Sequence, residues 1–151
     1  MSHEVKIIQT DGGSEYKPLK EYFQKKGIIH RTTCPHTSEQ NGIAERKHRH
    51  IVETGLTLLA QGSLPMKFWP NAFNTAVYLI NRLPTKVLKH LIPIEVLLGV
   101  KPDYKSLKTF GCLCFPCLRP YNNHKLNLRS TPCTFIGYGN NQKGYRCLSN
   151  D

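Results

Sequence analysis

The first hundred residues alternate short β-rich runs with stretches in which apolar residues recur at helical spacing. Two strands are predicted, over residues 5–10 and 28–34, and each ends at a turn or a loop. Four helices are predicted, over residues 16–26, 41–60, 68–82 and 92–98. This part of the chain is therefore expected to mix strands and helices.

The two longest predicted helices each carry an apolar side, which indicates a buried face. In residues 41–60 the apolar residues form one stripe, which consists of Ala44, Ile51, Val52, Gly55, Leu58 and Leu59. In residues 68–82 they form a second stripe, which consists of Trp69, Ala72, Phe73, Ala76, Val77 and Ile80. Core packing rather than base stacking is the expected role of the two largest aromatic rings in this second stripe.

The pattern changes near residue 100. From about residue 107 the chain is predicted to form strands and turns, with strands over residues 109–118, 132–138 and 145–148. We place a domain boundary at residues 101–106.

Length and composition narrow the class of protein. A chain of 151 residues is enough for one domain, or for one domain and a small appendage. No apolar run approaches the roughly 18 residues of a membrane span, and the first residues lack the apolar core of a signal peptide. We therefore expect no membrane partner, no secretion and reduced cysteines.

The net charge of +11 lies mostly in the later part of the chain. Residues 1–60 hold nine Lys/Arg and seven Asp/Glu, whereas residues 61–151 hold twelve and three. A basic domain favours polyanions such as nucleic acid, because binding releases counterions. Positive charge also serves solubility, so the charge alone does not decide between these two roles.

Two carboxylates stand on supports stiff enough for metal-dependent chemistry. Asp11 closes the first predicted strand and Glu45 lies in the first turns of the helix over residues 41–60, with 33 residues between them. Mg²⁺ keeps several waters and needs only a few rigid carboxylates, and two such ions can clamp the oxygens of a phosphoryl transfer. Each residue alone also fits a structural role: Asp11 in a turn, and Glu45 as a helix-dipole contact or a partner of Arg49.

Further short motifs surround these carboxylates and continue along the chain. They are Thr10-Asp11-Gly12-Gly13, Gly27-Ile28-Ile29-His30, Asn41-Gly42-Ile43-Ala44-Glu45-Arg46-Lys47, Phe68-Trp69, Asn81-Arg82-Leu83-Pro84, Phe110-Gly111-Cys112, Phe135-Ile136-Gly137-Tyr138 and Lys143-Gly144-Tyr145. In this order, and over nearly the whole chain, they closely resemble the integrases of copia-type LTR retrotransposons, especially those of plants.

The resemblance implies an α/β fold in two parts. Residues 1–100 would form a truncated ribonuclease H-like integrase core that lacks its opening strands. Residues 107–151 would form a small SH3-like β domain, itself incomplete. In the family's Asp-Asp-Glu site, Asp11 matches the second aspartate and Glu45 the glutamate, so the resemblance makes both catalytic residues and ligands of Mg²⁺ or Mn²⁺.

The resemblance also implies partners and a location. The family's enzyme trims the ends of transposon DNA and joins their 3′ hydroxyls to a target duplex. Asn41, Lys47 and Arg49 match the loop and helix that meet DNA, so they are expected to bind nucleic acid. The expected partners are transposon ends, a target duplex and further copies of the chain. The expected location is the nucleus for the parent element, and otherwise the cytoplasm or nucleus.

Two departures from the family pattern lower the expected activity. Only ten residues precede Asp11 and their sole acid is Glu4, so the first catalytic aspartate and the zinc-binding His/Cys domain are expected to be missing. Two carboxylates form an incomplete ligand set, so we expect weak metal binding and no activity of this chain alone. Ser38-Glu39 stands where the family often has Pro-Gln and adds an acid near the DNA path. A truncated open reading frame explains these features most simply.

The cysteines and histidines do not complete a metal site in the sequence. The cysteine cluster is C-x-C-x-x-C, made of Cys112, Cys114 and Cys117, with Cys133 and Cys147 further on. No paired C-x-x-C or histidine pair supplies four zinc ligands, so no zinc is expected and small buried side chains are the simpler role. A surface or nucleic-acid-facing position is expected for the histidines near the carboxylates, His30, His36, His48 and His50.

Other functions stay open at this stage. The chain could be a fragment of an integrase, as described above. It could instead be a non-catalytic basic module that binds nucleic acid or a protein partner through its C-terminal half. The basic residues of that half include Arg119, Lys125, Arg129, Lys143 and Arg146. A third outcome is a chain that does not fold stably, which a non-cooperative melt would reveal.

Overall fold

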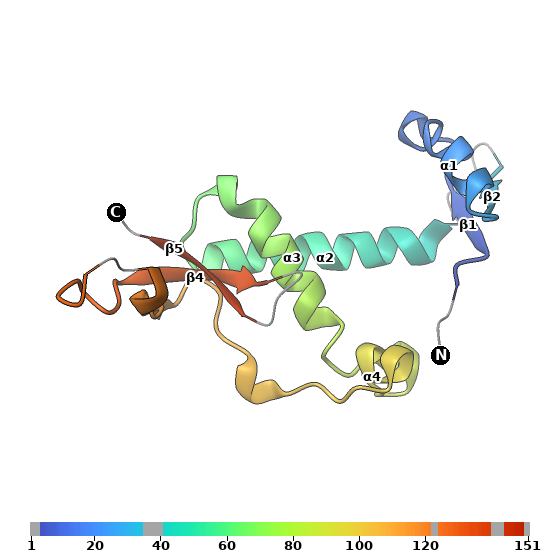
Figure 1. Cartoon of the computed structure of the whole chain (residues 1–151). Coiled ribbons are helices and arrows are strands. Elements are labelled where there is room, and N and C mark those ends of the chain that lie inside the picture. Colours follow the sequence, from blue (N-terminus) through green and yellow to red (C-terminus); the bar gives the residue numbers. More distant parts are fainter. Residues whose placement is uncertain (1–3, 35–40, 122–123, 140–143, 150–151) are drawn as a thin grey trace. The chain divides into compact units, whose positions relative to one another are not determined.

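The computed structural model describes residues 4–34, 41–121, 124–139 and 144–149 (Figure 1). The chain divides into two compact units, residues 1–49 and residues 50–151, each with its own internal packing. This division by compactness differs from the boundary expected at residues 101–106 between the two family domains. That boundary stays a prediction.

In residues 1–49 two parallel strands are joined by a short helical crossover. Strand β1 (Ile7–Thr10) pairs with β2 (Ile29–Thr32), with Ile7 beside Ile29 and Thr10 beside Thr32. The crossover consists of a 3-10 turn, η1 (Ser14–Tyr16), and helix α1 (Leu19–Lys25). Both predicted strands and the helix between them are confirmed, with shorter bounds.

Helix α1 begins later than predicted and ends where predicted. Pro18 occupies the N-cap position, which suits a residue that lacks an N–H and is tolerated only at the start of a helix. Gly27 follows the helix with a φ of +68°, the left-handed conformation in which glycine commonly ends helices.

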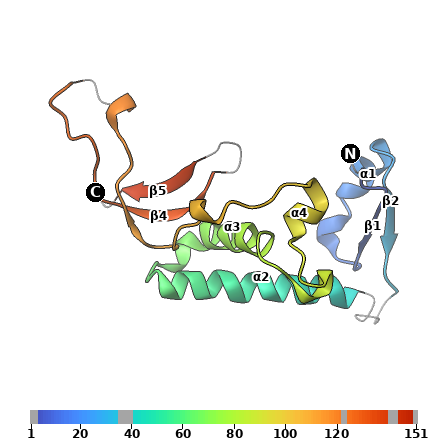
Figure 2. The same ribbon diagram turned by 90° about the horizontal axis from the view of Figure 1, so that it is seen from below.

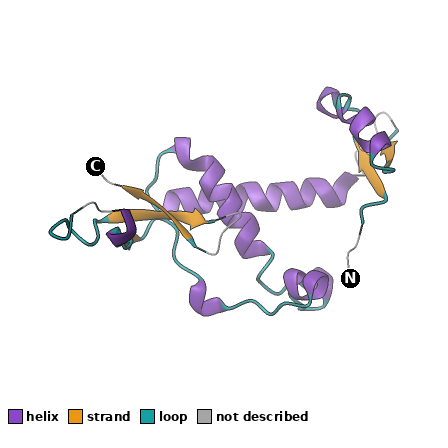
Figure 3. Ribbon diagram, in the orientation of Figure 1, coloured by secondary structure: helices purple, strands orange, loops and turns teal. Residues whose placement is uncertain are grey.

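Residues 50–151 combine helices with an antiparallel sheet (Figures 2 and 3). The helices are the second half of α2 (Gly42–Gln61), α3 (Trp69–Ile80) and α4 (Pro93–Leu98). The strands follow the order β3 (Leu113–Cys114), β4 (Cys133–Tyr138) and β5 (Tyr145–Ser149). Short 3-10 turns connect them: η3 (Met66–Phe68), η4 (Lys86–Leu88), η5 (Tyr104–Ser106) and η6 (Arg119–Tyr121).

The core of this unit forms where α3 meets both α2 and the sheet. Its central cluster consists of Leu59 from α2, Ala72 from α3, Ile136 from β4, and Phe110. Ala72 and Ala76 are completely buried, because small side chains let the helix axis approach the sheet closely. The prediction that these helices bury apolar stripes is therefore confirmed for Gly55 and Leu59 of α2 and for Ala72, Ala76 and Ile80 of α3.

The prediction is wrong for three members of the stripes, Ala44, Trp69 and Val77, which are exposed. Trp69 is 50% exposed and Val77 is 37% exposed, whereas Ala72, Ala76 and Ile80 of the same helix are buried. Trp69 contacts Phe73 edge-to-face, with 5.4 Å between ring centroids. Ala44 is also exposed, near the start of α2.

Two glycines fix the closest backbone approach in this unit. Gly111 has a φ of +81°, and a Cβ atom placed on it would lie 2.4 Å from the Cα of Gly62. No side chain fits in that space. Strand β3 contains only Leu113 and Cys114 rather than residues 109–118. The turn at Gly111 limits it on one side. Pro116 limits it on the other, because proline lacks the N–H that a hydrogen bond between strands needs.

Within the described ranges, none of the helices combines the length and the apolar character that crossing a membrane requires.

Candidate metal and nucleic-acid site

Asp11 lies directly after β1, at the start of the turn predicted from the two glycines. Its Oδ1 accepts a hydrogen bond from the backbone N–H of Gly13 at 3.3 Å, the usual way in which an aspartate stabilises a turn. The side chain is exposed to solvent. Asp11 therefore fulfils a turn role and keeps a solvent-accessible carboxylate.

A side-chain hydrogen bond joins β1 to the start of α2. Gln9 Nε2 donates to Asn41 Oδ1 at 3.4 Å. Gln9 stands two residues before Asp11, and Asn41 stands four residues before Glu45. Side chains two apart along a strand and four apart along a helix lie on the same side. The contact therefore brings the end of β1, which Asp11 follows, close to the start of α2, which carries Glu45.

Buried packing beneath β1 holds the end of that strand in place. Thr10 is 7% exposed, and its Oγ1 shares a hydrogen bond of 2.8 Å with His30 Nε2 on β2. The His30 ring also contacts Phe23 of α1 edge-to-face, with 5.3 Å between centroids. His30 therefore has a packing role rather than the surface role predicted for it. His36 lies outside the described residues.

The first turns of α2 carry the other predicted site residues. Glu45, Lys47 and Arg49 are exposed, and Asn41 is half-buried. His48 and His50 are exposed as predicted. Exposed cationic side chains on a helix start are well placed to reach phosphates, since nothing in residues 42–49 covers them.

The donor set fits Mg²⁺ in chemistry but is small. Carboxylate oxygens are the ligands that Mg²⁺ prefers, and Asp11 and Glu45 supply them. Across the part of the chain that the structure describes, no three His, Cys, Asp or Glu side chains gather into a metal-binding group. Asp11 and Glu45 thus offer two protein ligands, and water would have to supply the remainder.

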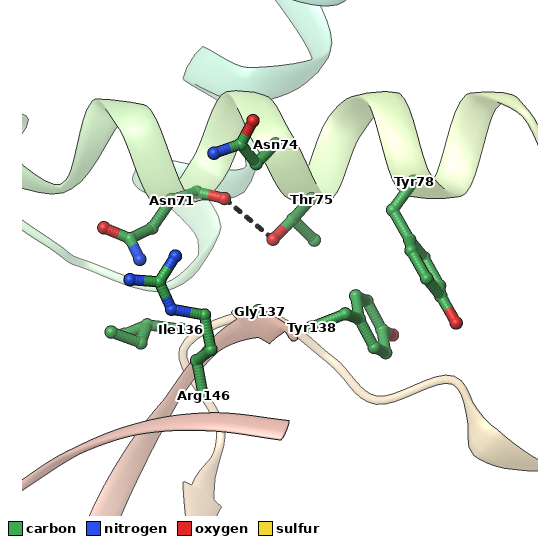
Figure 4. A pocket seen from close by; sticks show the side chains of 8 residues that line it. All are labelled: Asn71, Asn74, Thr75, Tyr78, Ile136, Gly137, Tyr138 and Arg146. Carbon is green, nitrogen blue, oxygen red and sulfur yellow. Dashed lines mark hydrogen bonds between the residues drawn. The ribbon is translucent and has the colours of Figure 1, made fainter. Parts of the chain in front are cut away.

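Residues 50–151 contain a small depression between α3 and the last two strands (Figure 4). The residues that line it are Asn71, Asn74, Thr75, Tyr78, Ile136, Gly137, Tyr138 and Arg146. Thr75 Oγ1 donates to the Asn71 carbonyl at 2.8 Å. The centre of a water molecule can move within only ≈ 20 Å³ there, which suits about one water rather than an organic ligand.

An aromatic stack closes one end of this depression. The rings of Tyr78 and Tyr138 stack at 3.8 Å with 10° between their planes, and the Arg82 guanidinium covers the Tyr78 ring at 3.3 Å. Burial raises the pKa of Tyr138, and a hydrogen bond with the Lys108 backbone opposes that shift. Sequence patterns gave no sign of this stack, because it joins residues 60 positions apart in the chain.

The comparisons with known proteins agree with the motifs. Residues 112–151 match the family described as the retroviral polymerase SH3-like domain. Over 144 residues the chain is 55% identical to the retrovirus-related Pol polyprotein from transposon RE1 of Arabidopsis thaliana. The chain belongs to the copia-type family of retrovirus-related Pol polyproteins.

A second Pol polyprotein, from transposon RE2 of the same plant, is 53% identical over 144 residues. Each match covers 95% of this chain but only 10% of the relative. The chain thus spans about a tenth of the length of the curated Pol polyproteins that it matches.

A solved structure supports the fold of this Pol segment. It is the cryoEM structure of the simian T-cell lymphotropic virus intasome in complex with PP2A regulatory subunit B56 gamma, with a TM-score of 0.53 and 18% identity. The match covers 95% of this chain and 55% of that one. At this identity the likeness concerns the fold alone. The expected small SH3-like β domain is confirmed, while the ribonuclease H-like core stays a prediction.

Proposed function

We propose that this Pol segment takes part in DNA integration, with the start of α2 contacting DNA and with Asp11 and Glu45 supplying two ligands of Mg²⁺ or Mn²⁺. The Gln9–Asn41 hydrogen bond carries the proposal, because it brings the end of β1, next to Asp11, close to the start of α2, which carries Glu45. The relationship to transposon Pol polyproteins supports the same assignment.

Each residue would act through a simple property. The chemistry that the metal supplies when bound is neutralisation of charge on a phosphate. Asp11, fixed by its bond to the Gly13 N–H, and Glu45, fixed on a helix, hold the ion in place. Lys47 and Arg49 bind phosphates and Asn41 helps to orient the strand. DNA and further copies of the chain would be the partners, in the nucleus.

The small ligand set limits what this segment does by itself. With two carboxylates, we expect weak metal binding and no strand transfer by these 151 residues. A strand-transfer assay with Mg²⁺ and with Mn²⁺ tests this. Turnover that disappears in Glu45→Gln would contradict the predicted inactivity and would support the assignment of Glu45.

Metal binding is tested separately from activity. Titration with Mn²⁺, followed by its electron paramagnetic resonance signal, should show weak binding that Asp11→Asn and Glu45→Gln each abolish. Glu21→Gln, an exposed glutamate on α1, is the matched control and should leave binding unchanged. Equal loss in all three variants would indicate a diffuse charge effect and would overturn the site.

DNA binding is tested through its dependence on salt. Lys47→Ala and Arg49→Ala should each lower the slope of log affinity against log salt by about 0.9, because each removes one phosphate contact. Lys20→Ala, an exposed lysine on α1, should leave the slope unchanged. Unchanged slopes in the α2 variants would overturn the assignment of that helix.

A second candidate function is non-catalytic binding by the basic C-terminal half. Arg146 is exposed beside the asparagines of the depression in Figure 4, a position from which it can reach a polyanion. DNA affinity that survives Asp11→Asn, Glu45→Gln and Lys47→Ala but falls in Arg129→Ala and Arg146→Ala would favour this function. Lys143, also expected to contribute, lies outside the described residues.

A further inference from the structure

The inner face of the C-terminal sheet carries three thiols. Cys114 on β3 is the register partner of Cys133 on β4, and Cys147 on β5 is the register partner of Phe135 on β4. Residues directly opposite each other in a sheet point to the same face, as do residues two apart along one strand. The side chains of Cys114, Cys133, Phe135 and Cys147 therefore share one face.

Two of these thiols are in direct contact. The Cys114 Sγ is the donor toward two acceptors, the Cys147 Sγ at 3.4 Å and the Cys133 carbonyl oxygen at 3.3 Å, which share its one proton. Both cysteines are reduced in the structure. The third thiol is engaged elsewhere, because Cys133 Sγ contacts Thr131 Oγ1 at 3.7 Å. The arrangement is thus a pair of thiols, and within the described ranges it is not part of a metal-binding group of three.

We propose that Cys114 and Cys147 form a reversible disulfide that links β3 to β5, with a small-molecule disulfide such as oxidised glutathione as the oxidant. The link would cross the central strand β4 and enclose residues 115–146. It would turn the two outer strands of the SH3-like module into one covalently closed unit.

The reaction proceeds by two thiol–disulfide exchanges. The Cys147 thiolate attacks one sulfur of oxidised glutathione, which breaks that S–S bond, releases one glutathione thiolate and leaves a mixed disulfide on Cys147. Cys114 then loses its proton, and its sulfur attacks the Cys147 sulfur and displaces the second glutathione. Two protein thiols are oxidised to one disulfide, and one oxidised glutathione is reduced to two glutathione thiols.

The environment of the pair sets the order of these steps. Burial, followed by the hydrogen bond with Cys147, raises the pKa of Cys114 from 9.0 to about 12. Cys114 is therefore held as the thiol that donates its proton, and it is a poor first nucleophile because the thiolate is the reactive form. Cys147 accepts that hydrogen bond and both cysteines are half-buried, so the protonated state of Cys114, rather than a difference in exposure, makes Cys147 the first to attack the oxidant.

The geometry favours a bridge that forms and reopens. A disulfide is about 2.05 Å long, so the two sulfurs must approach each other from 3.4 Å. β3 has only two residues in the ladder and β4 lies between β3 and β5, so the Cys114 and Cys147 side chains must lean across β4 and the short strand β3 must shift before the bridge closes. A bridge formed at the cost of such a shift is more easily reduced than an unstrained one.

The test equilibrates the full 151-residue chain in glutathione buffers of rising oxidised fraction and then traps the remaining thiols with an alkylating agent. Peptide mass spectrometry should find a Cys114–Cys147 cross-link that forms in the folded chain, disappears with dithiothreitol and raises the melting temperature. Cys117→Ser, an exposed cysteine close to β3, is the matched control and should leave the cross-link unchanged.

Each other outcome overturns the proposal. Glutathione adducts without a cross-link would show that the pair does not close. A dominant link from Cys133 to either partner would show that the strands pair their thiols differently. A cross-link equally abundant in urea would show that the fold does not select it. The wild-type peptide map decides between these results even if Cys114→Ser or Cys147→Ser fails to fold, and a folded variant of either kind should lose the link.

Discussion

Residues 1–49 and residues 50–151 differ in how much side-chain surface they remove from water. In the described part of the first unit, the buried side chains are Thr10 and Phe23. The second unit buries a continuous set from two helices and a sheet, with Leu59, Ala72 and Phe135 among them. Since each large apolar side chain contributes about 1.5–3 kcal/mol when fully buried, the second unit holds most of the folding energy.

The candidate metal site lies in residues 1–49, the unit that buries fewer side chains. Asp11 and the first turns of α2 belong to residues 1–49, where the other main elements are two strands and one short helix. A two-stranded sheet is marginally stable in water. Functional segments are often drawn from the less stable parts of a protein. We therefore expect a cooperative melt that reports residues 50–151, and earlier local opening around β1 and β2.

The largest expected effect tests the core of the second unit. Phe135 is 2% exposed and contacts Tyr138 and Tyr145 edge-to-face at 5.3 and 5.7 Å. Phe135→Ala should lower the free energy of unfolding by about 3–5 kcal/mol, because it leaves a cavity in packed surroundings. Urea denaturation measures this. Phe115→Ala, at a ring that is 62% exposed, is the control, and equal losses would show that the core is placed wrongly.

The next largest effect compares two glycines of helix α2, one in each unit. Gly55 and Gly42 both lie in α2, but a Cβ on Gly55 would meet the Phe73 ring, whereas nothing lies within 4 Å of a Cβ on Gly42. Gly55→Ala should destabilise the protein by about 1–3 kcal/mol through overpacking. Gly42→Ala should be neutral or slightly stabilising, since alanine favours the helix. Thermal melts of the two variants measure the difference, and the reverse order would contradict the packing of α2 on α3.

A smaller effect is expected in residues 1–49 alone. Thr10→Val removes the hydrogen bond to His30 and should cost about 1 kcal/mol. Hydrogen exchange followed by mass spectrometry should show faster exchange in β1 and β2 and unchanged exchange in β4 and β5. Thr32→Val, at an exposed position on β2, is the matched control. Faster exchange spread evenly over both units would show that they are not separate in stability.

The smallest effect appears at alkaline pH. The raised pKa of Cys114, from 9.0 to about 12, means that folding favours the protonated thiol. The resulting stability is complete below pH 9 and is lost as pH rises toward 12, and the raised pKa of Tyr138 acts in the same direction. Melting temperatures measured from pH 8 to 10.5 under reducing conditions should fall less for Cys114→Ser than for the wild type. Parallel curves would contradict this.

Helices and strands in which apolar residues recur at a regular spacing could be predicted from the sequence. The periodicity of α2 and α3 reflects the buried sides of these helices, and the β-rich runs around β4 and β5 reflect a sheet with an inner face. Bounds shifted where one residue overrides the pattern, as at Pro18 and Gly111. The exposure of Trp69 could not be predicted, because helical spacing gives a face but not which part of that face meets the sheet.

Contacts between distant residues lie beyond such patterns. The Gln9–Asn41 bond, the Tyr78–Tyr138 stack and the Cys114–Cys147 pair each depend on how strands and helices are registered in space. The motifs directed attention to Asp11 and Glu45 because of their residue type and family spacing, and the assignment of those two as a metal site stays a prediction.

Because Gly62 and Gly111 approach each other closely, keeping or losing these two residues indicates whether natural selection still acts on a copy of the gene. A single added methyl group at residue 111 would collide with the backbone of residue 62, whereas one at residue 62 would lie 3.2 Å from the nearest backbone atoms, so the fold requires Gly111 strictly and Gly62 less strictly. A gene copy that decays without selection should lose them as readily as it loses Gly144, where a methyl group meets nothing. Their persistence among sibling copies in a genome would mark those whose product is still being folded and used.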